Sequence, residues 1–501
     1  MTGSAASEGR YDILVFCSDQ HSAGAAGFMG DPLCQTPELD RIAASGMVFD
    51  NAYTACPLCV PARAALMTAR MPSRLGVFDN QGDYRSSEVT FAHLHALAGY
   101  QSVLIGRMHF VGMDFRHGFT RRLGKDFTGS YWGYSAVCRP DLREYAKGLR
   151  QQGCLELIGS GDTPVREYDR QVTAAALDYL SRDHDRPQLI VVGTYGPHFP
   201  YIADGPRMDR LRPLVQSSCR AETLEYQIPP LRRKVQEAPW EDIVELRCAY
   251  YALIEEMDQQ IGQVYGAFQR YLNRTGRKGV FVYLSDHGDQ IGYKGLYGKQ
   301  TFFERSAKIP LVFAGDGIGR GRSSASVSIM DVGPTLCQLN QTPPFPSADG
   351  ISLAPALRGG ALEDRQAVAE FYETLDGVPW VGLMIHRDGK KFIRYSGGQE
   401  HVLLFDTERD PGEERNLAGE YPGLCAQLGD RLNRSPAGPD RRADYQDCLE
   451  RYRLLSRLGP AHPEWNPDTF TASERVRHVQ DPWRRPARQA EQSSGMKSRG
   501  D

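Results

Sequence analysis

The sequence predicts an α/β fold: a doubly wound, mostly parallel sheet flanked by helices, with a smaller antiparallel sheet near the C-terminus. Three observations lead to this prediction. Strand patterns alternate with helical patterns up to about residue 360, which favours parallel strands joined by helical crossovers. Polar clusters follow several of these strands, at the edge where doubly wound sheets bind ligands. Beyond that point, short strands are separated by hairpin turns.

The N-terminal part supplies the first strands and helices. Residues 11–17 form an apolar run typical of a buried parallel strand. Thr36 and Pro37 predict a helix start, with a hydroxyl cap and a proline in the first turn, and Gly46 predicts its end. Further elements expected here are a helix beginning at Cys59, a helix ending near Gly99 and a strand over residues 101–106.

The alternation continues along the chain. The expected elements are a helix over 172–180, a strand over 189–194, a helix from about 240 to 272, a strand over 280–285, and short antiparallel strands over 367–371, 381–386, 391–395 and 402–405. We therefore expect a main α/β domain over 1–360, an antiparallel subdomain over 361–435, and an extension over 436–501. The extension is rich in Pro, Arg, Gln and Ser, which predicts partial disorder or an arm of a homo-oligomer.

Composition excludes several classes of protein. The 501 residues carry a net charge of −3, so no overall positive field attracts nucleic acid. The longest apolar runs have the length of strands and are too short to span a bilayer, so no membrane partner is expected. Residues 1–10 lack the pattern of a secretory signal. The eleven scattered cysteines suit a reducing compartment, and we expect a cytoplasmic protein.

The segment Cys59-Val60-Pro61-Ala62-Arg63 is the most informative motif. It places a sulfur nucleophile at the start of a helix, with a proline in the first turn and an arginine four residues on. Free N–H groups of that first turn would face an anion bound beside Cys59. The motif therefore predicts an anion site with a nucleophile.

Two further clusters follow predicted strands. Asp19-Gln20 comes after the first strand, and Asp286-His287 comes after the strand over 280–285. An aspartate in such a place is more often a helix cap than a metal ligand. Carboxylate and amide oxygens suit a hard divalent cation, so Ca²⁺ is the default, and His287 would also admit Mn²⁺.

Cys-x-Pro-x-Arg followed by Leu66-x-Thr68-x-Arg70 resembles the signature of the sulfatases. The resemblance implies that Cys59 is oxidised by a formylglycine-generating enzyme to formylglycine, whose hydrated aldehyde is the nucleophile. It also implies a divalent metal site. The implied ligands are Asp19, Gln20, the modified Cys59, Asp286 and His287.

The same resemblance implies an anion clamp. Lys299 matches the lysine that holds the sulfate and the leaving oxygen, and His198 matches a histidine near the leaving group. His109 matches the histidine that helps to break down the covalent intermediate, and Arg63 would support the modified residue. Arg107 stands where a lysine is usual; it keeps the charge but cannot lose a proton.

The motifs are most similar to those of choline sulfatases and phosphonate monoester hydrolases. The likeness rests on Thr36-Pro-Glu-Leu-Asp40, Pro57-Leu-Cys-Val-Pro61, Phe110-Val-Gly-Met-Asp114, His117-Gly-Phe119 and Ser285-Asp-His-Gly-Asp289. Trp132, in Tyr131-Trp-Gly-Tyr134, is a candidate for a cage around a quaternary ammonium, or packs an insertion over the site.

Three functions remain open. The first is a sulfuric ester hydrolase acting on a small-molecule or sugar sulfate, which we favour. The second is a phosphonate monoester or phosphodiester hydrolase on the same scaffold. The third is a non-catalytic anion-binding protein in which Cys59 stays unmodified.

Overall fold

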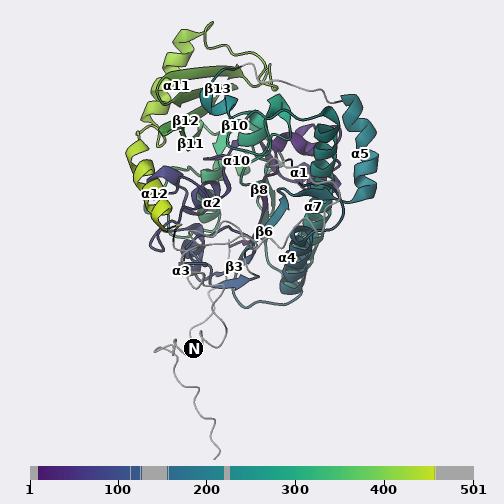
Figure 1. The fold of residues 1–501 in the computed structure, drawn as a ribbon. Coiled ribbons are helices and arrows are strands. Elements are labelled where there is room, and N and C mark those ends of the chain that lie inside the picture. Colours follow the sequence, from purple (N-terminus) through teal and green to yellow (C-terminus); the bar gives the residue numbers. More distant parts are fainter. Residues whose placement is uncertain are drawn as a thin grey trace, which may run out of the picture.

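An eight-stranded sheet forms the centre of the computed structural model (Figure 1), which describes residues 10–112, 114–124, 126, 155, 157–218, 226–455 and 457. Its strands, in spatial order, are β10 (Gly321–Ser328), β2 (Met47–Tyr53), β9 (Leu311–Gly315), β8 (Gly279–Ser285), β1 (Asp12–Asp19), β6 (Gln188–Pro197), β3 (Gln101–Gly106) and β4 (Arg121–Leu123). The strands predicted over 11–17, 101–106, 189–194 and 280–285 are all present in it.

The sheet is mostly parallel, which confirms the predicted fold class. Strands β8, β1, β6, β3 and β4 run parallel to one another. Strand β9 is antiparallel to both of its neighbours, β8 and β2, and β10 pairs in parallel with β2. The sequence pattern had not predicted β2, β9 or β10.

The helices that the structure describes before the small C-terminal sheet pack on the two faces of the main sheet, on one another or against the small sheet. They are α1 (Pro37–Ala44), α2 (Cys59–Thr68), α3 (Phe91–Leu97), α4 (Pro164–Leu180), α5 (Gly205–Ser218), α6 (Pro229–Arg232), α7 (Trp240–Thr275), α8 (Glu304–Ala307), α9 (Val332–Leu339) and α10 (Ala354–Leu357). A short two-stranded sheet joins β5 (Ile158–Ser160) to β7 (Tyr201–Ala203). Across the described ranges, no helix is both long and apolar enough to cross a membrane.

Strand β1 shows how the two faces are filled. Val15 and Cys17 belong to the apolar core that contains α2, α3 and α9, whereas Leu14 and Phe16 belong to the core that contains α1, α4 and α7. Successive side chains of a strand point to opposite faces, so a strand buried on both sides is apolar throughout. Figure 1 shows α4, α5 and α7 on one side of the sheet and α2 and α3 on the other.

The predicted C-terminal antiparallel sheet is present. It has the order β11 (Ala367–Leu375), β12 (Val378–Arg387), β13 (Lys390–Ser396) and β14 (Glu400–Asp406). Helices α11 (Pro422–Arg434) and α12 (Arg442–Leu455) follow it. Tyr445 of α12 contacts the rings of Phe78 and Tyr372, so the start of the predicted extension packs on the main body. The predicted domain limits at 360 and 435 stay predictions.

The N-terminus of α1 differs from its prediction. The helix begins at Pro37, but Thr36 makes no side-chain cap. Its hydroxyl instead donates to Asp40 Oδ1 at 2.9 Å. Asp258 of α7 supplies the cap, since its carboxylate accepts hydrogen bonds from the backbone N–H groups of Glu38 and Leu39. A tertiary contact has replaced the predicted local one.

Candidate active site

Strand register brings the predicted polar clusters to one level of the main sheet. Strands β1 and β8 pair in parallel up to Ser18 and Ser285. Asp19 and Asp286 therefore lie beside each other, one residue further along the chain. On the other side of β1, strand β6 ends level with Asp19 and leads to His198. The carboxyl edge of the sheet thus gathers side chains that are far apart in sequence.

Strand β3 delivers two more of the predicted residues to this edge. Its last residue, Gly106, pairs with Gly193 of β6, and Arg107 and His109 follow. Arg107 N donates to Gly193 O at 2.8 Å. A Cβ atom at Gly193 would lie only 1.7 Å from the Arg107 carbonyl oxygen, so glycine is required for this close approach.

Cys59 is the first residue of α2, as predicted. The helix starts there because Leu58 has an extended backbone, while Asn80 Oδ1 accepts a hydrogen bond from Val60 N at 3.0 Å. Pro61 lies in the first turn, where a missing N–H leaves no helical hydrogen bond unmade. Cys59 is 1% exposed, so its sulfur sits in the protein interior.

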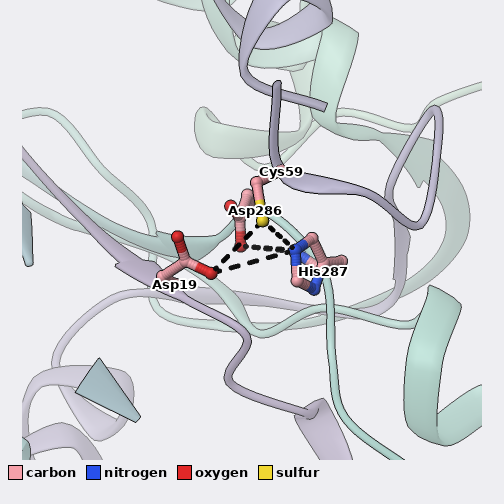
Figure 2. A group of neighbouring side chains, drawn as sticks. All are labelled: Asp19, Cys59, Asp286 and His287. Atoms are coloured by element: carbon pink, nitrogen blue, oxygen red, sulfur yellow. Dashed lines mark hydrogen bonds and ion pairs between the residues drawn. The ribbon is translucent and has the colours of Figure 1, made fainter. Parts of the chain in front are cut away.

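The Cys59 sulfur belongs to a buried cluster of potential ligands (Figure 2). It lies 3.2 Å from His287 Nε2 and 3.7 Å from Asp19 Oδ1. Asp286 Oδ1 is 3.6 Å from His287 Nε2. One ligand atom from each of these four residues lies within 4.8 Å of the others.

Arg63 holds the two carboxylates of this cluster. Its Nε donates to Asp286 Oδ2 at 2.8 Å, and its Nη2 donates to Asp19 Oδ2 at 3.2 Å. All three side chains are at most 1% exposed. Because Arg63 is one helical turn after Cys59, the same helix positions the sulfur and fixes the carboxylates. The resemblance had assigned Arg63 to the support of residue 59.

Arg107 also serves the protein framework. Its Nε donates to Asp19 Oδ2 at 2.7 Å, and its Nη1 donates to Asp126 Oδ1 at 3.1 Å. Its Nη2 lies 2.8 Å from His109 Nδ1. Since a guanidinium can only donate, His109 Nδ1 must be the acceptor. The guanidinium also lies over the Tyr195 ring, 4.6 Å from its centroid. In this arrangement Arg107 orients a carboxylate and a histidine.

Lys299, His198 and Gln20 form a polar chain beside the cluster. The Lys299 ammonium donates to Gln20 Oε1 and lies 2.7 Å from His198 Nε2. Because an ammonium can only donate, His198 Nε2 is the acceptor, and His198 Nδ1 then donates to Phe199 O at 2.8 Å. Burial and the Lys299 charge both lower the pKa of His198. The structure thus places the predicted lysine and histidine in contact.

The electrostatics of the site favour anions at its centre. Burial raises the pKa of the Cys59 thiol, but the charges of Lys299 and His287 lower it well below its usual value, helped by hydrogen bonds with His109 and His198. Burial lowers the pKa of Lys299, but the negative groups around it, Cys59 first and then Asp19 and Asp286, together outweigh burial and raise it. A negative group at position 59 is therefore stabilised by the residues around it.

The donor set fits a divalent cation. His287 Nδ1 lies 3.0 Å from Gly288 O. When the imidazole is neutral, as a metal ligand must be, Nδ1 keeps its proton there and the Nε2 lone pair faces the cluster. The Oδ2 atoms of Asp19 and Asp286 are held by Arg63, so each carboxylate turns Oδ1 inward. Two carboxylates and an imidazole suit Ca²⁺ or Mn²⁺.

Some predicted residues lie outside this geometry, and some functional candidates were missed. Trp132 and its aromatic neighbours lie outside the described residues. Asp126 had no predicted role, yet its Oδ2 accepts hydrogen bonds from the backbone N–H groups of Met108 and His109. Asp126 has no local motif to reveal it. Asp289 is the last residue of the Ser285–Asp289 motif, so that motif could have identified it from the sequence.

Comparison with known proteins agrees with this geometry. The sulfatase family model matches residues 12–341. Choline-sulfatase of Rhizobium meliloti (strain 1021) is 33% identical over 449 residues, which cover 84% of each chain. Delta 4,5-hexuronate-2-O-sulfatase of Bacteroides thetaiotaomicron is 25% identical over 461 residues, 85% of this chain and 89% of the relative.

The fold has a solved counterpart as well. The crystal structure of phosphonate monoester hydrolase of Agrobacterium radiobacter superimposes with a TM-score of 0.69 at 21% identity. The match covers 84% of this chain and 95% of that chain. At this identity the likeness concerns the fold.

The family model and the choline-sulfatase relative place the chain among the hydrolases of the alkaline phosphatase superfamily. The family match spans more than half of the chain, and a relative at 33% identity covers 84% of it. The chain therefore belongs to the sulfatase family, whose enzymes hydrolyse sulfate esters.

Proposed function

We propose that this enzyme cleaves a sulfate monoester with a formylglycine made from Cys59 and a divalent cation, Ca²⁺ by preference. The observation that carries the proposal is the placement of Cys59. Cys59 is the first residue of a buried helix. Its sulfur lies within 4.8 Å of a potential metal-ligand atom of each of Asp19, Asp286 and His287. A thiolate is a poor partner for a hard, oxygen-rich site, whereas a hydrated aldehyde offers one hydroxyl to the metal and one to attack.

The surrounding residues have separate tasks in this proposal. Asp19, Gln20, Asp286 and His287 would hold the metal with the modified residue. When bound, the metal neutralises sulfate oxygens and makes a nearby hydroxyl more acidic. Asp286 accepts the proton of the attacking hydroxyl.

The leaving group and the second half of the reaction need other side chains. Lys299 is charged and in contact with His198, so together they stabilise or protonate the leaving oxygen. His109, with Nδ1 held by Arg107, presents Nε2 toward position 59 and assists the expulsion of sulfate by the second hydroxyl. Arg107 and Arg63 keep these groups in place.

For the substrate we propose a small-molecule or sugar sulfate. The relatives include a choline-sulfatase and a hexuronate sulfatase, which name the two kinds of organic group to test first. The second candidate is phosphonate monoester hydrolysis, which the fold of the Agrobacterium radiobacter hydrolase favours. Aryl sulfate and aryl phosphonate, assayed side by side, separate the two.

The deciding experiment measures the modification and the product together. Produced with a formylglycine-generating enzyme, the chain should be about 18 Da lighter at Cys59. The same sample should release sulfate from choline sulfate or from a panel of sulfated sugars. An active sample in which Cys59 remains entirely a free thiol would overturn the proposal, and so would a fully modified sample that cleaves only phosphonates.

A further inference from the structure

We propose that Asp289 is a positioning residue that fixes the orientation of the Gln20 side-chain amide, so that the carbonyl oxygen of Gln20 faces the metal and anion site. The inference deepens the proposed function and rests on it for the identity of the bound groups. It concerns a residue to which the mechanism above gives no task.

The contacts of Asp289 lead to this inference. Asp289 is 0% exposed and follows His287 by two residues. Its Oδ2 accepts hydrogen bonds from Gln20 Nε2 at 2.5 Å and from Tyr201 Oη at 2.6 Å. Its Oδ1 accepts one from Ile291 N at 3.0 Å. Among the described residues, no arginine or lysine forms an ion pair with it, so its contacts are with neutral donors.

A carboxylate of this kind dictates which way an amide turns. Both oxygens of Asp289 already accept hydrogen bonds, Oδ2 from Tyr201 Oη and Oδ1 from Ile291 N, so the NH₂ group of Gln20 and not its oxygen is complementary to Asp289. The Gln20 oxygen then points to the opposite side, where it accepts a hydrogen bond from the Lys299 ammonium. The flipped amide would turn its NH₂ group toward Lys299 and place its oxygen against the carboxylate, and both contacts would be repulsive.

The backbone of Gln20 is constrained as well. Its φ angle is 72°, in the left-handed region that a side chain other than glycine seldom adopts. Tyr250 Oη donates to Gln20 O at 2.7 Å, and Gln20 N donates to Asp286 Oδ1 at 3.0 Å. These contacts fix the main chain but leave the side-chain torsions of Gln20 free. The contacts of its terminal amide with Asp289 and Lys299 fix which way the amide faces.

The same carboxylate connects three segments of the site. Gln20 follows β1, Tyr201 lies in β7 just beyond His198, and Asp289 itself follows β8. Outer contacts of this kind orient metal ligands, and their loss typically weakens metal binding about 10- to 100-fold. We therefore expect Asp289 to act through Gln20 on the bound ion.

The test exchanges the carboxylate of Asp289 and the amide of Gln20. In Asp289→Asn a single acceptor oxygen remains for the three donors of Gln20, Tyr201 and Ile291, so the orientation of the Gln20 amide is no longer fixed. Ca²⁺ affinity, measured by titration calorimetry on the full chain, should fall at least about tenfold. In the double variant Q20E/D289N, one oxygen of the carboxylate introduced at position 20 accepts from the amide introduced at position 289, and the other oxygen faces the ion. Affinity should then return to within about threefold of wild type.

Asp258→Asn is the matched control. Asp258 is also a buried carboxylate whose oxygens accept backbone N–H groups, but it caps α1 away from the site. This variant should lose stability without losing Ca²⁺ affinity. If Q20E restores the Ca²⁺ affinity lost in D289N, Asp289 acts through Gln20. A change at position 20 would not restore the affinity if Asp289 had only a structural role.

Two results would overturn the inference: unchanged Ca²⁺ affinity in D289N, or a double variant no better than D289N. Melting temperatures measured in the presence of a chelator report on the contact between Gln20 and Asp289 without metal or substrate. D289N and Q20E should each have a lower melting temperature than wild type, and the double variant should regain the wild-type value. Failure of the proposed function is a separate outcome, namely no sulfate release by the wild type, and it leaves these comparisons intact.

Discussion

At the scale of single residues, Arg63 neutralises two buried carboxylates at once. One guanidinium lies between two fully buried carboxylates, those of Asp19 and Asp286. Removing one partner of such a buried group leaves uncompensated charge, at a cost of about 3–5 kcal/mol. We therefore expect Arg63→Met to lower the free energy of unfolding by about that amount. The measurement is made in the presence of a chelator, so that no bound cation offsets the negative charge of the two carboxylates.

Denaturant unfolding checks this expectation, with Arg41→Met as the control. Arg41 also pairs with a carboxylate, that of Glu38, but the two side chains are 56% and 36% exposed. Exposed pairs contribute about 0–1 kcal/mol. Equal losses in the two variants would contradict the structural role assigned to Arg63.

Residue 59 allows a prediction about turnover. Cys59→Ala removes the proposed nucleophile while keeping a small apolar side chain at the start of α2, so the fold should persist. We expect kcat to fall at least ~10³-fold, as for an essential nucleophile. Circular dichroism and the melting temperature serve as the fold control, and a variant with near wild-type sulfate release would refute the assignment.

Sequence alone revealed part of this site. Cys59, Asp19 and Asp286 follow visible local signals: a helix start and the ends of buried strands. The partners of Arg107 and the role of Asp289 could not be read in the same way, because they depend on contacts between segments. A motif reports the spacing of residues along the chain, whereas a hydrogen bond depends on how the strands pair.

At the scale of elements, strand β11 of the small sheet is hydrogen-bonded to the segments just before and just after α2. Glu370 N donates to Ala55 O, just before α2. The Glu370 carboxylate accepts hydrogen bonds from Ser73 N and Ser73 Oγ, in the 3₁₀ helix Pro72–Leu75 that follows α2. The small sheet therefore helps to fix the position of Cys59.

Glu370 also makes stability depend on pH. Burial raises its pKa from its usual 4.5 to about 7. Between these two values the folded chain keeps a proton that the unfolded chain has lost, so the contribution to stability is full below pH 4.5 and disappears as the pH rises through 7. We expect Glu370→Gln to gain stability relative to wild type across this window, by up to about 1.4 kcal/mol per pH unit.

Chemical denaturation at a series of pH values measures this difference. Other buried carboxyls titrate in both proteins and cancel in the comparison. Glu363→Gln is the control, because that side chain is exposed just before β11. A difference between E370Q and wild type that is flat from pH 4.5 to 7 would show that Glu370 does not keep its proton.

At the scale of the whole molecule, the sequence predicted the layers better than the strand directions. Alternating apolar strands and amphipathic helices predicted a doubly wound sheet, and the hairpin turns predicted the small antiparallel sheet. Strand β9 runs against its neighbours, and an apolar run carries no sign of its direction. The cap of α1 by Asp258 was likewise invisible, because α7 lies more than two hundred residues further along the chain.

At the carboxyl edge, the proposed metal site predicts that the stability of the whole molecule depends on a cation. The carboxylates of Asp19 and Asp286 lie buried beside Cys59 and His287, with one ligand atom from each of the four residues within 4.8 Å of the others. A divalent ion that binds only the folded chain should raise the free energy of unfolding by about 2.7 kcal/mol at 100 times its Kd. We expect a chelator to lower the melting temperature and Ca²⁺ to restore it, as scanning calorimetry would show. Asp286→Asn should blunt the response to Ca²⁺, and a melting temperature that ignores both chelator and Ca²⁺ would argue against a metal site at this edge.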